Sequence, residues 1–194
     1  MNKEVKVPIE VSARHLHLTQ EDVDILFGDG YQLTNKRELS QKGYYVARER
    51  VEVVGKKASA SFGILTPLRN RTQVELAITD AIKLGIDVCV RMSGDLAGSA
   101  ACTLRGPNGE IELKEGVIIA KRHIHMSDRL AAELGISEDD EVSVKIEGDR
   151  GVVFDHVAIR TDPTFDITMH IDTDEGNATN INNKNLTYGT LIVK

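Results

Sequence analysis

Short runs of alternating apolar and polar residues dominate the hydrophobic pattern of the chain. The first run has apolar residues at every second position from Val5 to Val11, and it predicts a strand. Because side chains two residues apart lie on the same face of a strand, continuing the alternation places His15 and His17 on the inward-facing side. Pro8 cannot donate to a sheet ladder, which favours an edge position for this strand.

The same arrangement occurs twice along the chain. Arg14-His15-Leu16-His17 is followed by Thr19, a residue typical of a helix N-cap, and by an apolar run. Arg122-His123-Ile124-His125 is followed in the same way by Ser127 and by a helix expected over 128–134. Two copies of a strand, an Arg-His-x-His motif and a capped helix indicate a duplicated unit and therefore two similar subdomains.

Further β-like runs, separated by turn residues, fill the rest of the chain. They cover residues 44–46, 51–54, 61–65, 72–79 and 88–92, and then 141–146, 151–159, 166–171 and 190–193. Many short strands at close spacing, with few helices between them, are typical of small barrels or sandwiches. The pattern thus predicts a mainly β protein made of two related halves.

The composition narrows the function classes. A formal net charge of −6 and an aromatic content of 4%, with no tryptophan, argue against nucleic acid as a partner. No stretch approaches the length of a membrane span, so no membrane is expected. The two cysteines, Cys89 and Cys102, lack metal-type spacing, and such sparse cysteine is typical of a reducing, cytoplasmic compartment.

The two Arg-His-x-His motifs are the strongest chemical signal. Four of the six histidines lie in them, and two neutral imidazoles on one face of a strand form half of a metal site. A single pair of this kind is equally typical of strand histidines with ordinary hydrogen bonds. The recurrence in matching contexts favours metal binding.

Two other segments carry residues that suit such a site. Arg69 and Glu75 share one short stretch, where a guanidinium group suits phosphate and a carboxylate suits a metal. In isolation this stretch is more typical of a solvated strand edge. His170 directly precedes a run of acidic and small polar residues, interpreted as an unusual turn. That turn is either a further imidazole ligand with acidic neighbours or an acidic surface loop.

These segments together resemble the PduL-type phosphotransacylases, the phosphate propanoyltransferase family. The resemblance spans nearly the whole chain, in the same order. The matching stretches are SARHLHL, LFGDGYQL, PLRNRTQVEL with TD following, LGIDVCVRMSGD, AKRHIHMSD and HIDTDEGNA. The combination of the two histidine motifs is the most specific part.

The resemblance implies a fold of two similar six-stranded β-barrels, each capped by short α-helices, with the first strand joining the barrel of the C-terminal half. It places residues 4–13 and 121–194 in one barrel and residues 14–120 in the other, with a small hairpin insertion around 28–48. A homodimer is also implied. Some members carry an N-terminal extension that directs them into bacterial microcompartments. Here the first predicted strand begins almost at Met1, so we expect a freely cytoplasmic enzyme.

The resemblance also assigns roles to individual residues. Two divalent metal ions, expected to be zinc, would be held by two sets of three side chains. The first set is His15, His17 and Glu75, and the second is His123, His125 and His170. Arg69 would bind phosphate and act in catalysis. The residues expected to contact coenzyme A are Val11, Ser12, Ala13, Lys57 and Asn177.

The chain departs from the family pattern in three places. Gly63 stands where a basic residue is expected to help bind coenzyme A, and Lys56 is a candidate to compensate for it. Gly55-Lys56-Lys57 replaces a Gly-Pro-Lys/Arg turn, and Ser99-Ala100-Ala101 replaces a Ser-Pro-Gly segment. The departure at Gly63 bears on how tightly coenzyme A is held.

The implied reaction interconverts acyl-CoA and phosphate with acyl phosphate and coenzyme A, for propionyl or acetyl groups. Because no protein nucleophile is evident, direct transfer in a ternary complex is expected. A dinuclear hydrolase acting on thioesters or acyl phosphates is the first alternative, since two metals with bound water also suit hydrolysis. A non-catalytic metal-binding protein is the second, and it would require a closed shell of four protein ligands.

Overall fold

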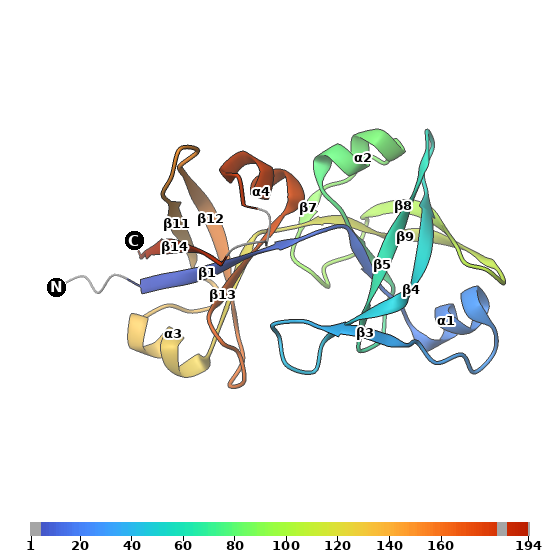
Figure 1. The fold of residues 1–194 in the computed structure, drawn as a ribbon, viewed down its shortest axis with the longest axis horizontal. Coiled ribbons are helices and arrows are strands. Elements are labelled where there is room, and N and C mark those ends of the chain that lie inside the picture. Colours follow the sequence, from blue (N-terminus) through green and yellow to red (C-terminus); the bar gives the residue numbers. More distant parts are fainter. Residues whose placement is uncertain (1–4, 182–185, 194) are drawn as a thin grey trace. The chain divides into compact units, whose positions relative to one another are not determined.

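The computed structural model describes residues 5–181 and 186–193, which form two compact units (Figure 1). One unit combines the strand that ends at Ser12 with the chain from Lys121 onward, and we call it the terminal barrel. The other unit runs from Ala13 to Ala120, and we call it the central barrel. Each unit has its own hydrophobic core.

The terminal barrel is a closed ring of strands in the order β1-β13-β10-β12-β11-β14. Their bounds are β1 (Val5–Ser12), β10 (His123–Met126), β11 (Glu141–Ile146), β12 (Val152–Thr161), β13 (Thr168–Asp172) and β14 (Thr187–Ile192). Closure leaves no unpaired sheet edge in the ring.

The central barrel closes in the order β4-β5-β2-β6-β9-β8, because β8 pairs with both β9 and β4. Its strands are β2 (His15–His17), β4 (Tyr45–Val54), β5 (Ser59–Thr66), β6 (Gln73–Glu75), β8 (Ala100–Arg105) and β9 (Glu110–Ala120). Two further strands lie outside the ring, β3 (Asn35–Glu38) beside β4 and β7 (Val90–Arg91) beside β9. The expectation of two six-stranded barrels is confirmed.

The two barrels repeat the same pairing pattern. The first histidine strand, β2, is parallel to β5 and antiparallel to β6, and β10 is likewise parallel to β12 and antiparallel to β13. The strand that precedes each histidine strand lies in the other barrel, since β1 joins the terminal barrel and β9 joins the central one. The expected position of the first strand is confirmed, and the structure shows that the exchange is reciprocal.

Two of the four helices in the described residues follow the histidine motifs, as expected. They are α1 (Gln20–Phe27) and α3 (Asp128–Leu134). The side chain of Thr19 accepts a hydrogen bond from the Asp22 backbone at the start of α1, and Ser127 caps α3 in the same way. The cap residues of the duplicated pattern thus have the predicted role.

The other two helices, α2 (Ile78–Leu84) and α4 (Thr173–Thr179), contradict predictions. A strand was expected over 72–79, but β6 ends at Glu75 and the chain then forms α2. Gly85, in a left-handed conformation, follows the last residue of this helix. The segment after His170 was interpreted as a turn, but it is the end of β13 followed by α4. That helix begins with a capping box formed by Asp172 and Glu175.

Pro8 lies within a closed barrel, so its expected edge position is wrong. The strand β1 pairs with β14 through Pro8, opposite Tyr188, but its pairing with β13 starts at Ile9. The missing N–H of the proline therefore falls just before the β13 ladder begins, where a lost donor is tolerated.

Buried apolar side chains fill both barrels. The residues between the paired histidines, Leu16 and Ile124, are fully buried, one in each core. Because neighbouring side chains of a strand point to opposite faces, the histidines lie on the face away from these cores, and the expectation that His15 and His17 face inward is wrong. None of the helices in the described part of the chain combines the length and apolarity that a membrane span requires.

Two valines of β12 test which face of this strand holds the terminal barrel together. Val157 is fully buried, and Val153 is 52% exposed. Val157→Ala should lower the free energy of unfolding by about 2 kcal/mol, because it removes buried methyl groups and leaves a cavity. Val153→Ala should change it by less than about 0.5 kcal/mol. Urea denaturation followed by circular dichroism measures both, and equal losses would contradict this core.

Candidate metal centre

The pairing of β2 with β6 brings three predicted ligands together in the central barrel. His15 lies opposite Glu75 in the antiparallel ladder, and His17 is two residues further along the same face of β2. All three residues are buried, with exposures of 8%, 3% and 9% for His15, His17 and Glu75. They offer one ligand atom each, all within 4.8 Å of one another.

The hydrogen bond of His15 sets which ring nitrogen faces the carboxylate. Its Nδ1 lies 2.8 Å from the Ala13 carbonyl oxygen, which only accepts, so Nδ1 carries a proton and Nε2 is the ring nitrogen that faces Glu75. His15 Nε2 lies 3.4 Å from Glu75 Oε2, and His17 Nε2 lies 3.8 Å from Oε1. Ligand atoms about 2.0–2.1 Å from one tetrahedral zinc are about 3.4 Å apart. The spacing therefore fits a single divalent cation.

The ionisation states also fit a metal. Burial, together with the neighbouring His15 and Arg69, lowers the pKa of His17 to about 3, so the ring is neutral near pH 7. Burial by itself would raise the pKa of Glu75, but the interactions with His15, His17 and Arg69 outweigh it and lower that pKa to about 2. A neutral imidazole and an ionised carboxylate are the forms that bind metal ions.

The hydroxyl group of Ser93 connects this site to Arg69, the residue predicted to bind phosphate. Arg69 Nη1 donates to Ser93 Oγ at 3.1 Å, and Ser93 Oγ donates to Glu75 Oε1 at 3.1 Å. Gln73 Nε2 donates to both Ser93 Oγ, at 2.8 Å, and Glu75 Oε1. The Gly94 backbone N–H in turn donates to Gln73 Oε1 at 2.8 Å. The network holds the Arg69 guanidinium beside the carboxylate of the candidate metal centre.

The other three predicted ligands gather in the terminal barrel. His123 lies opposite His170 in the pairing of β10 with β13. The ring centroids are 4.8 Å apart for His123 and His125, 5.3 Å for His123 and His170, and 4.8 Å for His125 and His170. Burial lowers the pKa of His125 to about 2, with His170 and His123 contributing, so this ring is neutral. Phe165 stacks on His125 with a centroid separation of 4.4 Å.

The two histidine clusters share one orienting device and differ in compactness. His123 Nδ1 lies 2.9 Å from the Lys121 carbonyl oxygen, which repeats the contact of His15 with Ala13. Within the described residues, the ligand atoms of His15, His17 and Glu75 all lie within 4.8 Å of one another. The ligand atoms of the three imidazoles in the terminal barrel do not meet this limit.

The residues predicted to contact coenzyme A are divided between the two barrels. Val11 and Ser12 end β1 and Asn177 lies in α4, all in the terminal barrel. Ala13 and Lys57 belong to the central barrel. The backbone N–H of Lys57 donates to the Leu84 carbonyl at the end of α2. These five assignments stay predictions.

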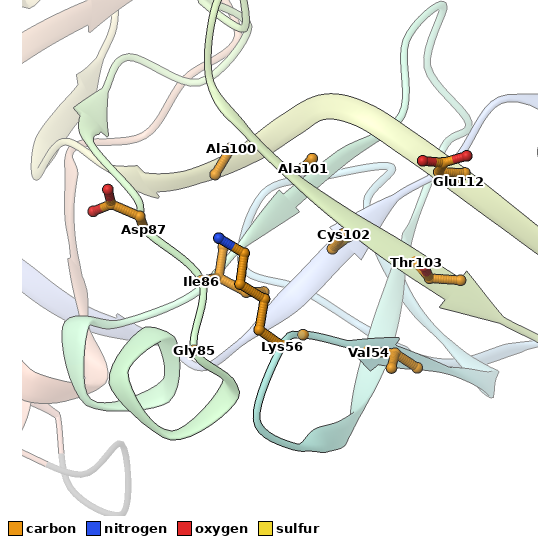
Figure 2. Close-up of a pocket in the computed structure, with 11 residues that line it drawn as sticks. Val54, Lys56, Gly85, Ile86, Asp87, Ala100, Ala101, Cys102, Thr103 and Glu112 are labelled. Carbon is orange, nitrogen blue, oxygen red and sulfur yellow. The ribbon is translucent and has the colours of Figure 1, made fainter.

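The central barrel has a pocket of about 390 Å³ (Figure 2). Lys56, Asp87 and Glu112 are the charged residues that line it, and Cys102 is also part of its lining. None of the predicted metal ligands lines this pocket. The candidate chemistry therefore lies on the paired histidine strands and not in this hollow.

Sequence reasoning missed two kinds of site residue. Gln73 and Ser93 are joined to Glu75 only by the fold, and nothing in their local sequence distinguishes them from ordinary strand and loop residues. Arg14 and Arg122 had a signal, because the arginine recurs in both copies of the motif, but no role was assigned to it.

Comparisons with known proteins cover nearly the whole chain. A sequence model of the phosphate propanoyltransferase family matches residues 8–182. A phosphate propanoyltransferase of Lachnoclostridium phytofermentans is 52% identical over 177 residues, which cover 90% of this chain and 83% of that protein. The phosphate propanoyltransferase of Thermotoga maritima is 46% identical over 190 residues, which cover 97% of this chain and 90% of that protein. The phosphate propanoyltransferase of Salmonella typhimurium is 47% identical over 179 residues, which cover 91% of this chain and 85% of that protein.

Glu75→Gln tests the candidate metal centre directly. The amide keeps an acceptor for Ser93 but loses the charge, so zinc affinity at one site should fall more than about 100-fold, beyond the 10–100-fold typical of outer-shell changes. Titration against a chromophoric chelator measures this affinity. Glu115→Gln is the matched control, because the Glu115 side chain is 41% exposed and paired with Arg71 in the same barrel. An unchanged affinity in Glu75→Gln would exclude Glu75 as a ligand.

Proposed function

The chain belongs to the phosphate propanoyltransferase family, and from this premise we propose that it transfers an acyl group between coenzyme A and phosphate. The substrates are acyl-CoA, of propionyl or acetyl type, and phosphate. The products are acyl phosphate and coenzyme A. The observation that carries the proposal is the chain of hydrogen bonds joining a buried His-His-carboxylate cluster to an arginine.

We propose that each barrel holds one divalent ion, most simply zinc. His15, His17 and Glu75 hold the first, and their spacing supports this assignment. His123, His125 and His170 hold the second. When bound, such ions lower the pKa of a thiol and stabilise negative oxygen, which is the assistance that thioester chemistry needs. Three protein ligands at each centre leave a position open, as in catalytic sites.

Arg69 is proposed to bind and orient phosphate. Ser93 accepts a hydrogen bond from one of its terminal nitrogens, which fixes the guanidinium plane relative to Glu75. A fixed guanidinium group binds phosphate through two parallel hydrogen bonds and neutralises part of its charge. Attack by phosphate oxygen on the thioester carbonyl then requires little reorganisation of the protein.

Coenzyme A is proposed to contact Val11, Ser12, Ala13, Lys57 and Asn177. The structure suggests a substitute for the basic residue absent at Gly63. Arg50 lies opposite Gly63 on β4, and a Cβ at Gly63 would be 3.6 Å from Arg50 Nη1. The guanidinium of Arg50 is also held by Ser61, through its hydroxyl at 2.7 Å and its carbonyl at 2.8 Å. Arg50 is thus a better-placed candidate than Lys56.

Direct transfer in a ternary complex is the proposed route. The thiol of Cys102 is buried, and burial raises its pKa to about 12, so it stays protonated and is a poor nucleophile. The Sγ atom of Cys89 lies 3.3 Å from Arg91 Nε, and Cys89 is not part of either histidine cluster.

A homodimer remains a further prediction.

Release of coenzyme A from propionyl-CoA or acetyl-CoA should require phosphate and stop when a chelator removes the metal. A thiol reagent follows the release with and without phosphate. Equal release without phosphate would instead identify a thioester hydrolase, and no release under any condition would favour a non-catalytic metal-binding protein. The requirement for phosphate therefore decides among the three activities.

Arg69→Ala should lower kcat/KM for phosphate by about 10²–10³-fold, the usual loss when a charge-stabilising donor is removed. Arg71→Ala is the matched control, because Arg71 lies two residues away but its side chain is exposed and paired with Glu115. Steady-state kinetics over a range of phosphate concentrations measures both. Similar losses in the two variants would remove Arg69 from this role.

A further inference from the structure

We propose that Arg14–Asp80 and Arg122–Glu175 are equivalent positioning pairs, one in each barrel, that hold the histidine strand in register with the strand carrying the third metal ligand. The inference rests on the proposed function, because it takes the two histidine clusters as metal sites. The four residues are outside the proposed sets of metal ligands and substrate contacts.

In the terminal barrel, the pair starts at the residue before His123. Arg122 Nη1 donates to Glu175 Oε1 at 2.7 Å, and its Nε donates to the Asp155 carbonyl at 2.8 Å. The guanidinium also lies over the ring of Phe154, at 5.3 Å from the centroid. The arginine is therefore restrained on three sides, and with it the start of the histidine strand.

The same carboxylate reaches the other ligand strand. Glu175 Oε2 accepts from the Asp172 backbone N–H at 3.0 Å, and Asp172 Oδ1 accepts from the Glu175 backbone N–H at 2.8 Å. Asp172 ends β13, two residues after His170, which lies opposite His123. Glu175 thus links the ends of both strands that supply imidazoles.

The central barrel repeats the contacts of the arginine with different residues. Arg14 Nη1 donates to Asp80 Oδ1 at 2.7 Å, its Nε donates to the Ser61 carbonyl at 3.3 Å, and its guanidinium lies 5.8 Å from the centroid of Phe62. Asp80 lies in α2, the helix that follows Glu75.

The positions of the two pairs match along the sequence. Asp80 follows Glu75 by the same number of residues as Glu175 follows His170, and each arginine directly precedes the first histidine of its motif. Both ion pairs are partly buried, with the arginine side chains 39% and 29% exposed, and single pairs that keep contact with solvent contribute modestly to overall stability. The arginine and the carboxylate recur at matching positions, and each guanidinium also contacts a carbonyl and a phenylalanine of the strand parallel to its histidine strand. This recurrence indicates a local role that both halves share, which is to fix the ligand strands.

The test measures zinc affinity with one site isolated at a time. Glu175→Gln is made in a Glu75→Gln background, which leaves the terminal site, and Asp80→Asn in a His170→Ala background, which leaves the central site. Each should weaken the remaining site by about 10–100-fold, the range for residues that orient ligands without touching the metal. Glu147→Gln is the control in the terminal barrel, because Glu147 is exposed and paired with Lys145.

Melting of each metal-free variant shows whether it is folded. Arg122→Lys and Arg14→Lys keep the charge but lose the Nε hydrogen bond and the flat group over phenylalanine, so they should give smaller losses of affinity and remain folded. Affinities equal to those of the parent proteins would overturn the inference, as would a lower melting temperature with unchanged zinc affinity. Absence of zinc binding in the unmodified chain would overturn the proposed metal centres as well, which distinguishes the two failures.

Discussion

The antiparallel register between each histidine strand and its neighbour is the constraint on which the candidate site depends. In the central barrel it places His15 opposite Glu75, and in the terminal barrel it places His123 opposite His170. A slip of one residue would turn every side chain of a strand to the other face. Both ladders are short, so closure of each barrel and the buried residues Leu16 and Ile124 must maintain the register.

The reciprocal exchange of β1 and β9 explains why the histidine motif has its form. The chain passes from one barrel to the other immediately before each motif. The carbonyls of Ala13 and Lys121 in these crossings orient the first imidazole, and the following arginine anchors the crossing to the helix beyond the third ligand. Backbone, arginine and histidine thus act together over a few residues, which is why the motif recurs as a unit.

Much of the fold could be predicted because it depends on local signals. Alternation revealed most strands, Thr19 and Ser127 revealed two helices, and the repeated motif revealed the duplication. The helix α2 was missed because its N-cap position, Ala77, has no side-chain cap, and α4 because its acidic residues also suit a loop. The edge position predicted from Pro8 was wrong because β1 is paired on both sides. The proline is tolerated there because the pairing of β1 with β13 begins only at Ile9.

The site was predictable to a smaller extent. Histidine spacing predicted two half-sites, residue chemistry made Glu75, His170 and Arg69 candidates, and the family resemblance assigned these three residues their roles. The roles of Gln73 and Ser93 depend on contacts between segments that are distant in sequence, so no local pattern could reveal them. The same holds for Asp80 and Glu175, whose equivalence becomes visible only when the two barrels are compared.

The most direct test of the account is the position of zinc in crystals of the metal-loaded protein, located by anomalous diffraction at the zinc edge. The account predicts one peak about 2.0–2.1 Å from Nε2 of His15, Nε2 of His17 and a carboxylate oxygen of Glu75, and a second among His123, His125 and His170. Zinc bound elsewhere, with the ladder between β2 and β6 intact and no peak at His15, His17 and Glu75, would contradict it.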